Sequence, residues 1–192
     1  MNRREAIQRT GLVLGYAVSV SALSGIVASC TTKPALTYKP DFFNDDQALL
    51  MSEIAQIIIP KTETAGAKEV GVPAFIDRMV KECYKKEDQD QFLAGLETFE
   101  NEAKKTHGSS FVTLEPEKQL LFVKTIHDEA VKKIKSDGGQ SPKPFIINIK
   151  ELTLLGFFTS KVGATEVLQY SAVPGEYKGC IPLAEVGKTW AT

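Results

Sequence analysis

The sequence predicts an all-α fold: a single helical domain of about five main helices with long ordered loops and an irregular C-terminal arm. Three observations favour this class. Apolar residues recur at spacings of three and four in several segments, no alternating segment long enough for a strand appears, and there is no internal repeat. The composition, 43% hydrophobic and 24% charged over 192 residues, is typical of a globular protein and argues against a disordered or collagen-like chain.

The first two helices are bounded by clear signals. Asn44 or Asp45 can cap a helix that Pro60 ends, and its apolar positions should be buried on one broad face. A polar connection over residues 61–71 follows. Pro73 suits the first turn of a second helix. The apolar side of this second helix comprises Phe75, Ile76, Met79, Val80, Cys83 and Tyr84.

Two further amphipathic helices are predicted over residues 90–105 and about 116–135. Gly108 lies past the end of the third helix, and Gly138 with the next glycine terminates the fourth. The inward residues of the third are Phe92, Leu93, Leu96, Phe99 and Ala103. The apolar residues of the fourth are Leu120, Leu121, Val123, Ile126, Ala130 and Ile134.

Residues 145–158 are apolar nearly all round and too long for a strand, which predicts a helix at the centre of the domain. From residue 173 onward, Pro or Gly interrupts the chain every few residues. We therefore expect this last part to form an irregular arm that lies across the bundle.

Residues 1–29 are expected to be a signal peptide of the twin-arginine type, because Arg3 and Arg4 precede an uncharged and mildly apolar stretch. The residues that follow the arginine pair, Ala6, Ile7 and Gln8, depart from the usual pattern. The general secretory route therefore stays open as the alternative.

The apolar stretch ends at Val-Ala-Ser-Cys, which resembles the bacterial lipobox and predicts lipidation of Cys30. A transmembrane anchor is the alternative, since residues 11–29 fall within the spanning length of ~17–25 residues. Either reading places an exported protein on the periplasmic face, anchored in the inner or the outer membrane. Residues 30–44 would then be the lipidated cysteine and a flexible tether, and residues 45–192 the helical domain.

Motifs for independent chemistry are missing from the sequence. His107 and His127 lie in neither HExxH nor a zinc spacing, and CxxC, CxxCH, phosphate-binding glycine loops and GxSxG are absent. We therefore expect no catalytic residue, no metal and no cofactor in this chain; an enzyme in its own right is the less favoured alternative. Arg78 is the only arginine after residue 29, which argues against nucleic acid as a partner.

Cys83 and Cys180 are expected to form a disulfide in an oxidising compartment. The loop of about 97 residues that it would enclose corresponds to a stabilisation of ~4–5 kcal/mol in the chain-entropy model. Two buried free thiols are the alternative, because the sequence does not give the distance between the two cysteines.

Four segments in this order resemble one family. They are residues 57–77, which include Pro-Lys-Thr-Glu-Thr-Ala-Gly, then residues 92–96, residues 150–165, and residues 170–182, which end in Gly-Cys-Ile-Pro. Together they are similar to the gluconate 2-dehydrogenase subunit 3 family, the small subunits of membrane-associated flavoprotein dehydrogenases. Ala65 stands where family members usually have proline, so this loop is expected to be less rigid.

The resemblance implies a non-catalytic partner of a large FAD-dependent dehydrogenase subunit of the glucose-methanol-choline type, which oxidises a sugar or sugar acid. FAD would be held by that partner, and a cytochrome c acceptor would be reached through it. The small subunit would supply the export signal, help its partner fold and cross the membrane, and here also tether it. A free-standing lipoprotein binding module that reuses the subunit fold is the alternative.

The resemblance also places the partner interface in the loop of residues 62–70, near residue 163, and in the arm. An equally weighted alternative is that these segments wrap the core of the domain itself. The expected interface residues are Thr62, Thr64, Gly66, Val70, Gly163, Thr165, Tyr177 and Ile181.

Overall fold

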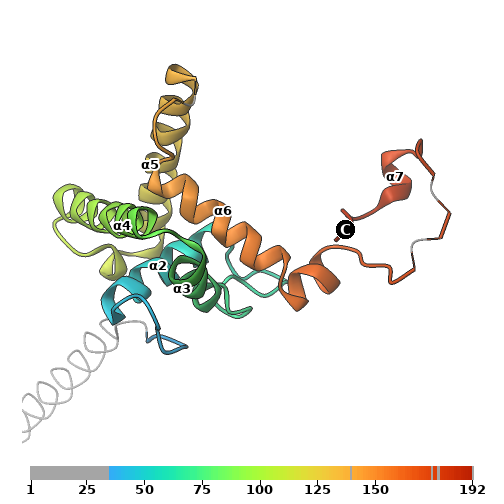
Figure 1. Ribbon diagram of the computed structural model, residues 1–192, viewed down its shortest axis with the longest axis horizontal. Helices are drawn as coiled ribbons and strands as arrows, with labels where there is room; N and C mark the ends of the chain where they lie inside the picture. The colour runs from blue at the N-terminus through green and yellow to red at the C-terminus, as the bar shows by residue number, and fades with distance from the viewer. Residues whose placement is uncertain (1–34, 139, 174, 177, 192) are drawn as a thin grey trace, which may run out of the picture. The chain divides into compact units, whose positions relative to one another are not determined.

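The computed structural model describes residues 35–138, 140–173, 175–176 and 178–191 (Figure 1). The expected signal peptide with Arg3 and Arg4, and the expected lipidation site Cys30, lie outside these residues. Residues 35–192 group into one compact unit. None of the helices in the described part of the chain is long and apolar enough to cross a membrane.

The all-α prediction is confirmed, since the described residues form helices and no strand. Three short helical turns accompany the five main helices, and one of them, α7, lies within the arm that we expected to be wholly irregular. In chain order the elements are α2 (Asp45–Ile58), α3 (Val72–Cys83), α4 (Lys86–His107), η1 (Phe111–Thr113), α5 (Pro116–Asp137), α6 (Phe145–Phe158), η2 (Gly163–Val167) and α7 (Leu183–Val186).

Helix α6 is the centre of the domain, as its apolar sequence predicted. It contacts α2, α3, α4, α5 and η2. Its buried residues lie on one broad face of the helix, namely Ile146, Ile149, Leu152, Thr153, Gly156 and Phe157. Two of its apolar side chains, Leu155 and Phe158, remain 47% and 38% exposed.

The ends of the helices follow local signals. The Asn44 side chain accepts a hydrogen bond from the backbone N–H of Gln47, and the Gln47 side chain accepts one from the backbone N–H of Asn44, which makes a complete capping box. Pro73 and Pro116 lie in the first turns of α3 and α5. Gly108 ends α4 in the left-handed conformation, with φ of 74°.

Two helical predictions need correction. Helix α4 begins at Lys86 rather than at residue 90, and Gln89 in its first turn donates hydrogen bonds to the carbonyls of Val80 and Lys81 at the end of α3. Contacts of this kind, between a polar side chain and another helix, leave no trace in the spacing of apolar residues. On α5, Val123 is buried, but Leu120 and Leu121 are 56% and 64% exposed, and Gln119 and Phe122 are buried instead of them.

A chain of phenylalanine rings forms much of the core. Phe92 on α4 lies against Phe43 and Phe145, with ring centroids 5.7 and 5.2 Å apart. Phe99 continues the chain to Phe111 and Phe122 at 5.0 and 5.1 Å. Because edge contacts between aromatic rings favour defined geometries, this cluster fixes α4, η1, α5 and α6 relative to one another.

The segment before α2 is part of the folded domain, which corrects the expected flexible tether for residues 35–44, the part of it that the structure describes. The carboxylate of Asp77 on α3 accepts hydrogen bonds from the backbone N–H groups of Asp41, Phe42 and Phe43, at 2.7, 3.2 and 3.0 Å. Asp77 is 3% exposed and Phe43 is 5% exposed. The folded domain therefore includes this segment, which we call the N-terminal strap (residues 35–44).

Tyr38 belongs to the same strap. Leu36, Tyr38 and Phe42 pack against the hydrophobic core. Burial, and to a lesser extent the carboxylate of Asp77, raises the pKa of the Tyr38 phenol above its ordinary value. The phenol is therefore held in its neutral form against α3.

Candidate partner-binding surface

Only part of the predicted interface loop is accessible. Thr62 and Thr64 are exposed, and the backbone N–H of Thr62 donates to the carbonyl of Thr64 at 3.0 Å. Their hydroxyl oxygens lie 3.5 Å apart. This tight local turn presents both threonines on the surface, where a partner could contact them.

The second half of the same loop packs on the domain itself. Gly66 is buried, and a Cβ there would lie 2.7 Å from the backbone N of Lys61, so no side chain fits. Val70 packs against the core, and Ala67 is fully buried. The buried position of Gly66 favours the alternative that this half of the loop wraps the core of the domain itself, and its role at an interface stays a prediction.

Two contacts fix this loop on α2. The Lys68 ammonium donates to the Glu53 carboxylate at 2.6 Å, and both side chains are largely shielded from water. The backbone N–H of Lys68 donates to the Gln56 side chain at 2.9 Å. The loop is thus held in one conformation, and Thr62 and Thr64 lie at its outer end.

Gly163 opens a π-helical turn directly after α6. It is buried, its N–H donates to the Ser160 hydroxyl at 3.1 Å, and its carbonyl accepts from the N–H of Leu168 at 2.9 Å. Its burial favours the same alternative, in which the segment packs on the domain itself, and its role at an interface also stays a prediction. Thr165 in the same turn is exposed, and its hydroxyl donates to the Lys161 carbonyl.

Gln169 closes the C-terminal arm, which in the structure comprises residues 169–191. Its backbone N–H donates to the Thr189 carbonyl, and its carbonyl accepts from the N–H of Ala191, both at 2.9 Å. Its side-chain amide donates to the carbonyls of Val186 and Lys188. One residue thereby brings the two ends of a loop of about twenty residues together.

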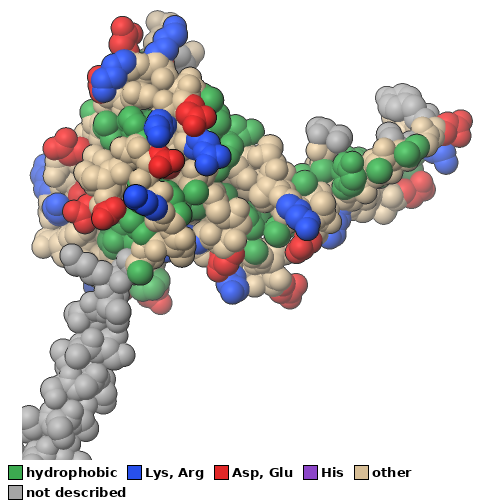
Figure 2. Space-filling model, turned by 60° about the horizontal axis from the view of Figure 1, so that its bottom comes forward, with side chains coloured by type: hydrophobic (Ala, Val, Ile, Leu, Met, Phe, Trp, Pro, Cys, Tyr) green, Lys and Arg blue, Asp and Glu red, His purple; other side chains and the backbone are tan. Residues whose placement is uncertain are grey.

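The arm exposes apolar side chains. Val173 and Leu183 are 83% and 85% exposed, and Tyr170, Trp190 and Ile181 are 62%, 52% and 41% exposed. Figure 2 shows hydrophobic side chains along this part of the chain. Ile181 is thus accessible as predicted, and Tyr177 lies outside the described residues. A cluster of exposed apolar groups of this kind is typical of a surface that a partner covers.

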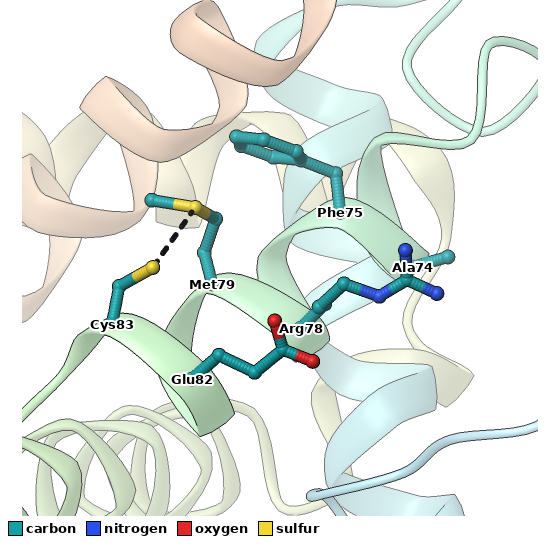
Figure 3. Close-up of a pocket in the computed structure, with 6 residues that line it drawn as sticks. All are labelled: Ala74, Phe75, Arg78, Met79, Glu82 and Cys83. Carbon is teal, nitrogen blue, oxygen red and sulfur yellow. Dashed lines mark hydrogen bonds between the residues drawn. The ribbon is translucent and has the colours of Figure 1, made fainter.

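A second apolar area lies on α3, where a shallow depression is lined by Ala74, Phe75, Arg78, Met79, Glu82 and Cys83. Figure 3 shows the ring of Phe75 and the sulfur atoms of Met79 and Cys83 on the side towards α6, and Arg78 directed away from it. Phe75 packs so closely on Gly156 of α6 that a Cβ at Gly156 would lie 2.6 Å from its ring. The sequence placed Phe75, Met79 and Cys83 on the apolar side of this helix, and apolar periodicity does not distinguish a buried face from one left open.

The expected disulfide is not formed in the structure, where Cys83 and Cys180 are free and exposed. The Cys83 thiol faces the Met79 sulfur on its own helix, at 3.8 Å. Cys180 lies in the arm, which closes on itself through Gln169. The length of the enclosed loop sets how much a disulfide would stabilise the fold. Whether the disulfide forms depends on the distance between the two cysteines, which loop length does not give.

The described residues contain no group of three or more His, Cys, Asp or Glu side chains placed to hold a metal ion. His127 lies 2.9 Å from Lys150, and His107 packs edge-on against Phe122 with ring centroids 5.6 Å apart. Each histidine is therefore in contact with a different neighbouring helix.

Comparison with known proteins gives one match. No curated protein and no solved structure is detectably similar to this chain. The family model for gluconate 2-dehydrogenase subunit 3 matches residues 45–175. The matched region contains the five main helices, the loop of residues 62–70 and η2, and it ends within the arm. The chain therefore belongs to the gluconate 2-dehydrogenase subunit 3 family, the accessory subunits of dehydrogenase complexes.

Proposed function

We propose that this chain is the non-catalytic small subunit of an FAD-dependent dehydrogenase of the glucose-methanol-choline type that oxidises a sugar or sugar acid. The large subunit would hold FAD and pass electrons to an acceptor such as a cytochrome c. This chain would escort the large subunit across the membrane, support its folding and tether it to the periplasmic face through a lipid on Cys30. The observation that carries the proposal is the family membership combined with an exposed apolar arm.

Three features support docking of the large subunit on the arm and the neighbouring surface. The arm carries five large apolar or aromatic side chains that the domain itself does not cover. The face of α3 adds Phe75 and Met79 beside one arginine, and arginine and aromatic residues are enriched at protein interfaces. Thr62, Thr64 and Thr165 are accessible on ordered turns, so their hydroxyl groups are preorganised for contact.

The export role predicts a specific result in cells. When the chain is co-expressed with a candidate flavoprotein subunit that has no signal peptide of its own, removal of residues 1–29 should leave the flavoprotein in the cytoplasm, with periplasmic dehydrogenase activity reduced about tenfold or more. Replacing Arg3 and Arg4 with lysine should reproduce this loss if export follows the twin-arginine route. Fractionation and an activity assay with an artificial electron acceptor measure both effects.

The matched control for the export experiment is Cys30→Ser, which should release active complex from the membrane without retaining it in the cytoplasm. A flavoprotein that reaches the periplasm normally without this chain would contradict the escort role. A neighbouring flavoprotein with its own signal peptide would favour the free-standing binding module instead.

The docking role predicts that the double variant Val173→Ser, Leu183→Ser binds the flavoprotein about tenfold more weakly or worse. Burial of each such side chain contributes about 1.5–3 kcal/mol, part of which is lost to ordering of the interface. The melting temperature of the isolated chain should stay unchanged, because both residues are exposed. Glu176→Ser, Lys178→Ser in the same arm is the matched control, and biolayer interferometry measures both affinities. Equal affinity of the two double variants would place the interface elsewhere.

A further inference from the structure

A small open cavity of about 210 Å³ lies where α2, α5 and α6 meet, and the proposed docking surface does not include it. Its walls are apolar. They consist of Ile57 and Ile58 from α2, Leu120 and Val123 from α5, and Ile146 from α6. The exposure of Leu120, at 56%, follows from its place at this opening.

Three nitrogen-bearing side chains complete the lining, namely Lys124 and His127 from α5 and Lys150 from α6. The Lys150 ammonium lies 2.9 Å from Nε2 of His127. An ammonium group can only donate, so Nε2 of His127 accepts in this contact. Nδ1 of the same ring faces the carboxylate of Asp128 at 3.3 Å, on the opposite edge of the ring from Lys150. The two lysines supply positive charge at the cavity.

The charged side chains that line the cavity indicate the class of ligand that it can bind. The lining residues include two lysines and no aspartate or glutamate. Lys150 has three donors, of which one is used by His127. An uncharged apolar ligand would cover this ammonium without giving it a partner, which is costly. A sugar acid does not fit either, because the apolar walls offer no partners for its hydroxyl groups.

We propose that this cavity binds a small amphipathic carboxylate, with a short apolar chain between the isoleucines and its carboxylate at Lys150 and Lys124. The volume of the cavity is below the ~300–1,000 Å³ of pockets for drug-sized ligands, so the apolar chain of the ligand must be short. The site is independent of the docking role proposed above. Its ligand chemistry is that of a medium-chain fatty acid.

The test uses hexanoate as the probe and the full chain in lipid nanodiscs, with ¹³C labels on the isoleucine methyl groups. Hexanoate should shift the methyl signals of Ile57, Ile58 and Ile146 saturably, and leave that of Ile181 in the arm unchanged. Hexanol, which has the same chain without the charge, should bind about tenfold more weakly, since its hydroxyl oxygen can accept a hydrogen bond from an ammonium but has no negative charge to strengthen it. Lys150→Met should weaken hexanoate binding by about the same factor.

Lys132→Met is the matched control, because it removes the same charge from an exposed position on α5. It should bind hexanoate as the parent does, and Lys150→Arg should retain most of the affinity. The proposal is overturned if the three methyl signals do not move, or if hexanol binds as tightly as hexanoate. Should Lys150→Met unfold the domain, the comparison of hexanoate with hexanol on the parent chain still shows whether the cavity selects a carboxylate.

Discussion

Replacing Asp77 with alanine should lower the free energy of unfolding by about 3 kcal/mol, because three backbone N–H groups of the N-terminal strap lose their acceptor. If the strap stays in place, the Phe43 donor is buried without a partner and the donors of Asp41 and Phe42 are partly buried without one. If it detaches, the apolar surface of Phe43 and Tyr38 becomes exposed. Either outcome is destabilising. For a domain of this size the melting temperature should fall by about 6–12 °C, as measured by circular dichroism.

Two comparison variants make this test specific. Asp77→Asn keeps one carboxyl-like oxygen as an acceptor and should lie between alanine and the parent chain. Asp90→Ala removes an exposed carboxylate on α4 that pairs with Lys86, and should change the melting temperature by no more than about 2 °C. Hydrogen exchange at the amides of Asp41, Phe42 and Phe43 should accelerate only in the Asp77 variants. An unchanged melting temperature for Asp77→Ala would refute the role of this residue as the anchor of the strap.

Gly163→Ala should be the second strongly destabilising change, costing about 2–4 kcal/mol. A Cβ at this position would overlap the carbonyl oxygen of Phe157 and lie 3.0 Å from the Cα of Phe158. Both obstacles are backbone atoms of α6, so the turn must open to admit the methyl group. Glycine to alanine within a helix ordinarily stabilises, and the expected effect therefore has the opposite sign from helix propensity.

Thr165→Ala is the control for that experiment. It lies in the same π-helical turn, is exposed, and loses only one hydrogen bond, from its hydroxyl to the Lys161 carbonyl. It should cost less than about 1 kcal/mol. Differential scanning calorimetry compares the two variants with the parent. A Gly163→Ala protein as stable as the parent would show that the turn relaxes at no cost.

The helical framework was predictable because its signals are local. Asn44, Pro73, Pro116 and Gly108 mark helix ends through their own backbone or side-chain chemistry, and the structure places helix ends beside each of them. The start of α4 was missed because it is stabilised by Gln89, whose partners are on another helix.

Burial was harder to predict where a helix has few neighbours. Helix α5 packs mainly on α2 and α6, so only a narrow stripe through Phe122, Val123 and Ala130 is covered. Leu120 and Leu121 are as apolar as the residues of that stripe, so periodicity alone predicts burial for them equally well. Their exposure depends on which helices are adjacent, which is a tertiary property.

The strap could have been anticipated from two signals. Phe43 directly precedes the helix cap at Asn44, a position where an apolar residue often packs back on the helix. Asp77 occupies the buried side of α3, between Ile76 and Val80, and a carboxylate at such a position requires partners. The partners themselves were not predictable, since they are backbone groups more than thirty residues earlier.

The fixed strap also determines how far the domain can stand from the lipid. With the proposed acylation at Cys30, the chain up to Leu36, the first residue packed on the core, spans at most about 20 Å when fully extended. If the chain were instead free up to the start of α2, its fully extended length would be more than twice as great. The bound flavoprotein would accordingly be confined to a thin layer above the bilayer, within short reach of electron acceptors held in the same membrane.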